Sequence, residues 1–199
     1  MNHTVSPSKM THLAIFASGT GTNAQKIIEF FKNHPHISVS LIVANNPNAG
    51  VLRIAETENI PTLILDKNTF FSGDEYIHVL QKKQIHWIIL AGFLWKIPKT
   101  LIEAFPQKII NIHPALLPKY GGKGMYGKRV HEAVIQQAET ESGISIHLVD
   151  EFYDHGELIF QAKCNLEVFE TPESLARKVQ ALEHTHFAPC IESYIEKNR

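Results

Sequence analysis

An asparagine and a histidine two residues apart, directly after an apolar stretch, are the residues of this chain best suited to chemistry. In an extended segment residues i and i+2 project to the same side, so Asn111 and His113 would face one pocket. Pro114 keeps His113 extended, because a proline disfavours the helical conformation of the residue before it. An amide that polarises a carbonyl and an imidazole that handles a proton together indicate acyl transfer.

A carboxylate that could orient this histidine lies in a second motif. Residues 143–156 alternate like a strand and then run into an acidic turn that contains Asp150 and Asp154. A lone Asn-x-His is more often a turn or a satisfied polar pair, and an acidic turn is more often merely exposed. The combination favours catalysis by Asn111, His113 and Asp154, because a carboxylate stabilises a charged imidazole beside it. We expect Asp154 to raise the pKa of His113 above that of an unpaired ring.

The glycine-containing turn at residues 18–23 is a candidate anion site. Gly19 and Gly21 would let backbone N–H groups approach an anion, and the helix expected after them adds its dipole. A dinucleotide fingerprint would need a third glycine, and an acidic residue where this chain has Asn45 and Asn46. The turn is therefore either a plain connection or an anion site of a kind other than a dinucleotide site.

The composition is typical of a soluble globular protein. The 199 residues are 44% hydrophobic and 20% charged, with a net charge of −1 and no basic run, so no nucleic acid or membrane partner is expected. Cys164 and Cys190 give no disulfide framework, and the 12 histidines form no metal-binding motif, so no metal is expected. Because there is no signal-peptide pattern and no long apolar run, we expect a cytoplasmic protein.

Apolar runs alternate with helical patterns, which predicts an α/β fold with a mostly parallel twisted sheet and helices on both faces. Strands are expected at residues 13–17, 39–44, 62–65, 87–91 and 109–113, with an antiparallel extension at 143–148 and 158–163. Helices are expected at residues 23–32, 51–58, 74–82, 99–105 and 128–137, and Thr171 is a suitable N-cap for a long helix that starts at Pro172. In such sheets ligands bind beyond the carboxyl ends of the strands, where the turn at 18–23 and the Asn-x-His motif lie.

Two motifs together closely resemble the folate-dependent formyltransferases. They are Asn-Ile-His-Pro-x-Leu-Leu-Pro-Lys-Tyr at residues 111–120, and Gly-x-Ser-x-His-x-Val at 143–149 with Asp-x-Gly at 154–156. The resemblance extends from Thr11 to about Tyr194. It implies a single Rossmann-like formyltransferase domain at residues 11–199, after a flexible extension at 1–10. It also implies transfer of the formyl group of 10-formyltetrahydrofolate to the amine of glycinamide ribonucleotide, in purine biosynthesis.

The resemblance further implies which residues bind the two substrates. The ribonucleotide-binding residues are Gly21, Thr22, Asn23 and Glu183, and the folate-binding residues are Leu94, Trp95, Lys96, Ile97, Asn111, Asp150 and Asp154. Two positions depart from the family. Trp95 stands where an arginine is familiar, and Gly73 stands where an arginine often meets the folate tail, so the way the tail is held is open.

Other readings and some structural details are left open. Relatives that use water, aminoacyl-tRNA or an amino sugar as acceptor share the catalytic core but carry an additional domain, and a non-catalytic nucleotide-binding module would bind without turnover. The glycine-rich residues 119–128 are either a plain surface loop or a mobile flap beside the site. The expected assembly is a monomer or a homodimer, and the resemblance hints at a cis peptide between Leu117 and Pro118.

Overall fold

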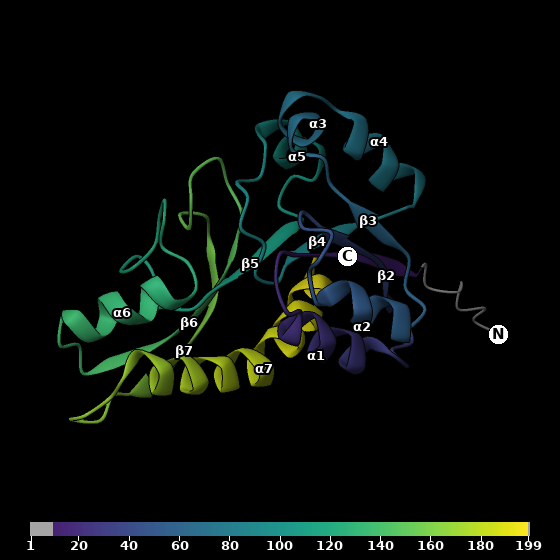
Figure 1. The fold of residues 1–199 in the computed structure, drawn as a ribbon. Helices are drawn as coiled ribbons and strands as arrows, with labels where there is room; N and C mark the ends of the chain where they lie inside the picture. Colours follow the sequence, from purple (N-terminus) through teal and green to yellow (C-terminus); the bar gives the residue numbers. More distant parts are fainter. Residues whose placement is uncertain (1–9, 199) are drawn as a thin grey trace.

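The computed structural model describes residues 10–198, which build a seven-stranded sheet with helices on both faces (Figure 1). The strand order is β3-β2-β1-β4-β5-β6-β7, in which β1 to β5 run parallel and β6 and β7 are antiparallel additions. The strands are β1 (Thr11–Ala17), β2 (Ile37–Ala44), β3 (Thr62–Ile64), β4 (Trp87–Leu90), β5 (Ile109–His113), β6 (Glu141–Leu148) and β7 (Leu158–Asn165). The expected α/β sheet with its antiparallel extension is confirmed. The expected N-terminal extension lies, apart from Met10, outside the described residues.

The helices divide into two groups, one on each face of the sheet (Figure 1). Leu13 and Ile15 of β1 face an apolar layer with α1, α2 and α7, whereas Ala14 and Phe16 face a layer with α3, α4 and α5. This division follows from the alternation of side chains along a strand. The helices are α1 (Thr22–Phe31), α2 (Val51–Thr57), α3 (Lys67–Ser72), α4 (Glu75–Lys82), α5 (Lys99–Ala104), α6 (Lys128–Gln136) and α7 (Pro172–Lys197).

The helix α3 was not expected from the sequence patterns. It is six residues long and too short to show a helical period, so the sequence patterns predict no element there. Asp66 begins the helix by accepting a 2.9 Å hydrogen bond from the backbone N–H of Thr69. The helix places Phe70 against Trp95, with 5.7 Å between the ring centroids. A helix that local patterns could not reveal therefore supports the loop after β4.

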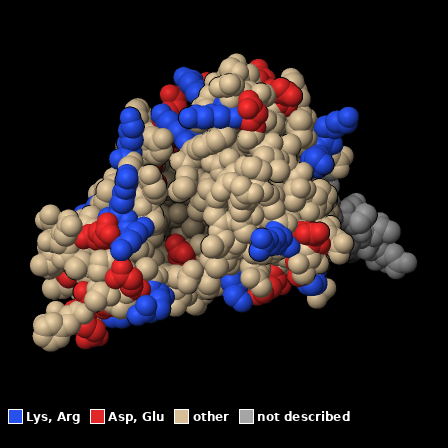
Figure 2. All heavy atoms as spheres, in the orientation of Figure 1, with Lys and Arg blue, Asp and Glu red and all other residues tan. Residues whose placement is uncertain are grey.

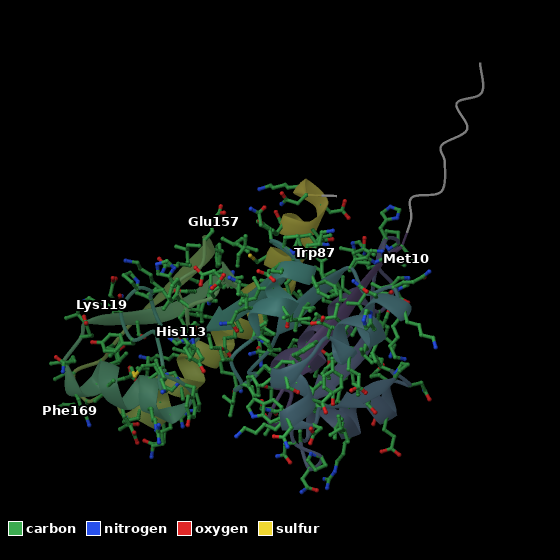
Figure 3. All side chains as sticks on the ribbon, turned by 90° about the horizontal axis from the view of Figure 1, so that it is seen from above. Met10, Trp87, His113, Lys119, Glu157 and Phe169 are labelled. Atoms are coloured by element: carbon green, nitrogen blue, oxygen red, sulfur yellow. The ribbon has the colours of Figure 1, made fainter. Side chains whose placement is uncertain are left out.

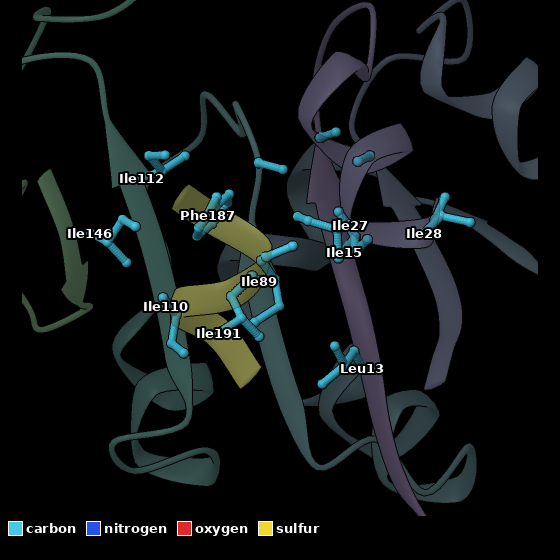
Figure 4. Packing of buried hydrophobic residues seen from close by; sticks show 14 of the residues in the cluster. Leu13, Ile15, Ile27, Ile28, Ile89, Ile110, Ile112, Ile146, Phe187 and Ile191 are labelled. Carbon is cyan, nitrogen blue, oxygen red and sulfur yellow. The ribbon is translucent and has the colours of Figure 1, made fainter. Parts of the chain in front are cut away.

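The long helix α7 connects the parallel part of the sheet to its antiparallel extension. As expected, Thr171 caps its start, and Thr171 and Ser174 each accept a hydrogen bond from the backbone N–H of the other. Figure 4 shows Phe187 and Ile191 of α7 among the buried side chains of the central strands, beside Ile110 of β5. The helix also contacts α1, α6, β6 and β7. Residues along α7 are therefore held at fixed positions across both parts.

The antiparallel pairing of β5 with β6 places polar residues opposite one another. Asn111 lies opposite His147, and His113 lies opposite Ser145. Directly opposed residues of an antiparallel pair project to the same face with their Cβ atoms roughly 5 Å apart. On the other side of β6, the backbone of β7 approaches so closely that a Cβ on Gly143 would lie 1.9 Å from the carbonyl oxygen of Ala162. Gly143 is thus required by the packing of β7 on β6.

Gly143→Ala should lower the free energy of unfolding by about 2 kcal/mol or more, because the added methyl group overlaps a backbone oxygen in the β6–β7 ladder. Gly73→Ala is the matched control, since Gly73 has an extended backbone and open space around it. Its stability should stay within about 0.5 kcal/mol of the wild type. Chemical denaturation measures both variants, and equal stability of the two would contradict the close approach at Gly143.

Candidate active site

A cavity of about 650 Å³ opens at the carboxyl ends of the parallel strands. Its walls come from the loops after β1, β4 and β5, from residues 122–128 with α6, from the turn after β6, and from α7. Figure 2 shows it as a hollow near the middle of the molecular face. Open α/β sheets bind ligands at this edge, and the volume lies within the usual range for small-molecule sites.

Asn111 presents its side-chain amide to the cavity from the end of β5. Its Nδ2 lies 3.0 Å from Nε2 of His147, and Nδ1 of His147 lies 2.7 Å from the carbonyl oxygen of Leu148. A carbonyl oxygen only accepts, so we assign the ring proton to Nδ1 and let Nε2 accept from Asn111. His147 therefore fixes the orientation of the amide and leaves its second N–H for a ligand.

His113 is a buried imidazole at the end of β5, only 3% exposed. In Figure 3 it lies between the parallel part of the sheet and the β6–β7 extension. Its Nε2 lies 2.7 Å from the carbonyl oxygen of Tyr120, so the uncharged ring carries its proton on Nε2. The lone pair is then on Nδ1, which lies 3.5 Å from Oδ1 of Asp154. A proton accepted by this ring would therefore lie beside a carboxylate.

Asp154 lies near two histidines but is held by the glycine-rich loop. Its Oδ1 is 3.5 Å from Nδ1 of His113 and 3.7 Å from Nε2 of His147. Its Oδ2 accepts a 2.9 Å hydrogen bond from the backbone N–H of Gly122. Asp154 also has a left-handed backbone, with φ of 52°. The carboxylate thus acts on His113 through its charge, at a distance longer than an ordinary hydrogen bond.

Burial lowers the pKa of His113 below its ordinary value, and the charge of Asp154 offsets this only in part. Asp154 thus raises the pKa of His113, as expected, but the expectation that the pKa lies above that of an unpaired ring is wrong, because the loss of solvent outweighs the neighbouring carboxylate. For Asp154, burial raises the pKa, but the contacts with His147, His113 and Gly122 together lower it. At neutral pH an uncharged imidazole thus faces a charged carboxylate.

Two polar residues of the antiparallel strands hold the loop that follows His113. Ser145 Oγ donates a 2.7 Å hydrogen bond to the carbonyl oxygen of Ala115 and accepts a 2.9 Å hydrogen bond from the N–H of Leu117. Gln161 Nε2 donates to the carbonyl oxygen of Leu117 at 3.0 Å and to Ser145 Oγ at 2.9 Å. The Leu117–Pro118 peptide is cis, as the resemblance suggested. The loop that carries the carbonyl partner of His113 is therefore fixed from the sheet.

Ser145, His147 and Gln161 were not predicted as site residues. Ser145 and His147 alternate with Gly143 along β6, which places all three on one face of a buried strand, and this period was a usable signal. Gln161 has no comparable signal, because a single polar residue in an edge strand is common. Its role depends on the register of β6 with β7, in which Gln161 lies opposite Ser145.

Asn23 of α1 and Glu183 of α7 form one wall of the cavity. Asn23 Nδ2 donates a 2.8 Å hydrogen bond to Oε2 of Glu183. Burial raises the pKa of Glu183, and the hydrogen bond from Asn23 opposes this shift. Oδ1 of Asn23 is buried without a partner among residues 10–198. Two residues named from separate segments of the sequence are thus brought together by the packing of α1 against α7.

Gly21 and Thr22 lie at the start of α1, next to the cavity-lining Gly19 and Asn23. Gly21 has φ of 83°, a left-handed backbone that favours glycine. A Cβ at this position would lie 2.7 Å from Cβ of Val51 at the start of α2. Packing of α1 against α2 thus requires this glycine, whatever the turn binds.

The loop after β4 forms the opposite wall. The backbone N–H of Leu94 donates a 2.9 Å hydrogen bond to Oγ of Ser18, which ties this loop to the one after β1. Trp95 packs against Phe70 and Phe71 of α3, with 5.7 Å between ring centroids in each pair. The tryptophan that departs from the family pattern is therefore supported by the helix that the sequence patterns did not predict.

The turn after β6 closes the cavity beside this loop. Nζ of Lys96 lies 5.7 Å from the centroid of the Tyr153 ring, an arrangement that favours a cation–π contact. Asp150 Oδ2 lies 2.7 Å from Nδ1 of His155. The two loops therefore meet through side chains at the edge of the cavity.

Most of the residues named from the sequence line this cavity. Those that do are Asn23, Leu94, Trp95, Lys96, Ile97, Asn111, His113, Asp150, Asp154 and Glu183. Among the residues that the structure describes, no group of three His, Cys, Asp or Glu side chains could hold a metal ion. Within the same residues, no helix combines the length and the apolar character needed to cross a membrane.

Comparison with known proteins decides the family. A model of the formyl transferase family matches residues 11–191. The chain belongs to the formyl transferase family. The chloroplastic phosphoribosylglycinamide formyltransferase of Arabidopsis thaliana is 38% identical over 93% of this chain, which spans only 65% of that relative's length. The phosphoribosylglycinamide formyltransferase of Bacillus subtilis is 31% identical, over 95% of this chain and 97% of the relative.

A solved structure also matches the whole formyl transferase fold. The crystal structure of phosphoribosylglycinamide formyltransferase from Bacillus halodurans has a TM-score of 0.85 with this chain, at 33% identity. The match covers 95% of this chain and 97% of that one. The two chains thus share the same overall fold over nearly their whole lengths.

Removal of the charge of Asp154 should lower the pKa of His113 further. Asp154→Asn keeps the size of the side chain but removes the charge that favours the imidazolium. If uncharged His113 accepts a proton in turnover, the acidic limb of the pH–rate profile should move to lower pH. The rate at the optimum should fall, because the charged ring has lost its partner. NMR titration of His113 in both proteins measures the shift, and an upward shift would exclude Asp154 from this role.

Proposed function

We propose that this chain transfers the formyl group of 10-formyltetrahydrofolate to the amine of glycinamide ribonucleotide, a step of purine biosynthesis. The observation that carries the proposal is one cavity that holds Asn111, His113 and Asp154 together with the buried Asn23–Glu183 pair. The first group suits acyl transfer, and the pair suits the hydroxyl and N–H groups of a ribonucleotide. The bacterial relatives that match over nearly their whole length bear the name of this enzyme.

In this reaction Asn111 stabilises the charge that develops on the formyl oxygen. The amine attacks the formyl carbon, and the electron pair of the C=O bond moves to oxygen. One N–H of Asn111 is bound to His147, so the other can donate to that oxygen without reorientation. A donor that is already oriented costs no reorganisation when the charge appears, which is why such groups contribute strongly to rate.

His113 moves the proton. Its Nε2–H is bound to the carbonyl oxygen of Tyr120, so a proton from the attacking amine goes to Nδ1, beside Oδ1 of Asp154. The carboxylate stabilises the charged ring for as long as it carries that proton. The proton then passes to the folate nitrogen as the C–N bond to the formyl carbon breaks, and the ring returns to its uncharged form.

The residues of the opposite wall fit a reduced folate. Leu94 and Ile97 give an apolar surface for a flat ring system, and the backbone between them offers donors and acceptors for its polar edge. Trp95 is fixed by aromatic neighbours and is available for stacking with the more distant part of the cofactor. Asp150 also lines this part of the cavity. The folate tail is thus assigned to an aromatic surface in place of an arginine.

The ribonucleotide is assigned to the side of the cavity formed by α1 and α7. Glu183 and Asn23 would bind the ribose or glycinamide groups, and the backbone N–H groups of Gly21 and Thr22 at the start of α1 would hold the phosphate. The free Oδ1 of Asn23 has no partner within residues 10–198 and is available to the same ligand. The two substrates would then bind on opposite sides of Asn111.

We further propose a cytoplasmic location and assembly as a monomer or homodimer, with small molecules as the partners. Cys164 and Cys190 are free thiols, which fits a reducing compartment. The net charge of −1 fits neither nucleic acid nor an anionic membrane as a partner.

An acceptor screen tests the proposed reaction. The chain is incubated with 10-formyltetrahydrofolate and with glycinamide ribonucleotide, water, an amino sugar or aminoacyl-tRNA, and the change in folate absorbance is followed. Glycinamide ribonucleotide should support rates at least about 100-fold higher than the other acceptors, because its ribose and glycinamide groups are the ones assigned to the buried Asn23–Glu183 pair. Comparable turnover with another acceptor would contradict the proposal, and nucleotide binding without turnover would indicate a binding module.

A further inference from the structure

His131 is a buried histidine of α6 with a polar atom that no described residue satisfies. The residue is 6% exposed and lines the cavity. Its Nδ1 is buried and has no hydrogen-bond partner within residues 10–198. A buried polar atom without a hydrogen-bond partner destabilises the protein, so its presence at a binding cavity points to a ligand that completes the hydrogen bond.

The other two histidines of the cavity differ from His131 in this respect. The nitrogens of His113 face the carbonyl oxygen of Tyr120 and the carboxylate of Asp154, and both nitrogens of His147 are hydrogen-bonded. Burial lowers the pKa of His131, and positive charge on His113 lowers it further. Its ring is therefore uncharged at neutral pH, and an uncharged imidazole has one nitrogen that accepts a hydrogen bond.

The position of His131 associates it with the acceptor of the formyl group. It lies on α6, which packs against α7, the helix that carries Glu183. It is also close enough to His113 for the charge of one ring to affect the other. His131 therefore shares the cavity with His113, the residue assigned to the proton, and sits on a helix packed against the one assigned to the ribonucleotide.

We propose that Nδ1 of His131 accepts a hydrogen bond from an N–H of the glycinamide portion of the acceptor. An amine attacks only when its lone pair points at the carbonyl carbon, so its N–H groups must point elsewhere. A hydrogen-bond acceptor at a fixed place in the cavity holds one N–H of the amine, and this orients the lone pair of the amine before reaction. His131 thus contacts the substrate and positions it, whereas His113 receives the proton. This inference rests on the proposed function.

Two substitutions of His131 separate binding from packing. His131→Phe keeps an aromatic ring and removes both nitrogens, so the unpartnered atom is lost and stability should be unchanged or higher. The value of kcat/KM for glycinamide ribonucleotide should nevertheless fall about 10-fold or more, while KM for the folate changes by less than about 2-fold. His131→Asn keeps a polar atom near the place of Nδ1 and should recover part of the loss.

Ser142→Ala is the matched control. Ser142 is 2% exposed, and its Oγ is also buried without a partner within the described part of the chain. Ser142 does not belong to the cavity lining, so its substitution should alter neither kcat/KM nor KM. Thermal denaturation of all variants shows whether any change in activity comes with a loss of stability.

Two measurements on the whole chain test the role of His131. They are steady-state kinetics, and calorimetric titration of glycinamide ribonucleotide in the absence of folate. Weaker ribonucleotide binding by His131→Phe at unchanged stability, with recovery in His131→Asn, supports the proposal. Wild-type kinetics in His131→Phe, or a loss of stability with equal effects on both substrates, overturns it. If the wild type used only another acceptor, the proposed function and this role would both be wrong. If the wild type used glycinamide ribonucleotide and His131→Phe matched it, only the role of His131 would be wrong.

Discussion

The antiparallel pairing of β6 with β5 is the constraint on which the site depends. Parallel strands bring their carboxyl ends to one edge, but they leave the groups there facing only loops. The antiparallel neighbour places a second row of polar side chains opposite the first, with His147 across from Asn111 and Ser145 across from His113. His147 orients the amide, and Ser145 holds the loop after β5. The close packing of β7 at Gly143 keeps this second row in place.

Burial makes these groups effective and also makes them costly. His113 stays uncharged because it is removed from water, so in the proposed reaction it would accept a proton that Asp154 would then stabilise. Oδ1 of Asn23 and Nδ1 of His131 remain without partners within residues 10–198, in the cavity that is proposed to bind the substrates. Such costs are tolerated when the rest of the fold is well packed, as in the two apolar layers that enclose the sheet. Binding of substrate would complete the same hydrogen bonds.

Much of the fold could be predicted from the sequence, because long apolar runs and helix caps are local signals. The alternation of strands and helices, the antiparallel extension and the Thr171 cap were all visible in the pattern. The helix α3 was not, since six residues show no period. The orientation of His147 and the contact of Gln161 with Ser145 depend on register, which a single strand does not encode. The net direction of the pKa shift of His113 could not be predicted, because the sequence shows the neighbouring charge of Asp154 but not the burial of the ring.

The central claim is that the amide of Asn111, oriented by His147 across the β5–β6 pair, stabilises charge on the formyl oxygen. The most direct measurement is kcat of Asn111→Ala at saturating glycinamide ribonucleotide and 10-formyltetrahydrofolate, with circular dichroism to confirm the fold. Because this donor acts on the transition state, kcat should fall about 10²-fold or more while the fold stays intact. A folded Asn111→Ala variant with near-normal kcat would contradict the claim.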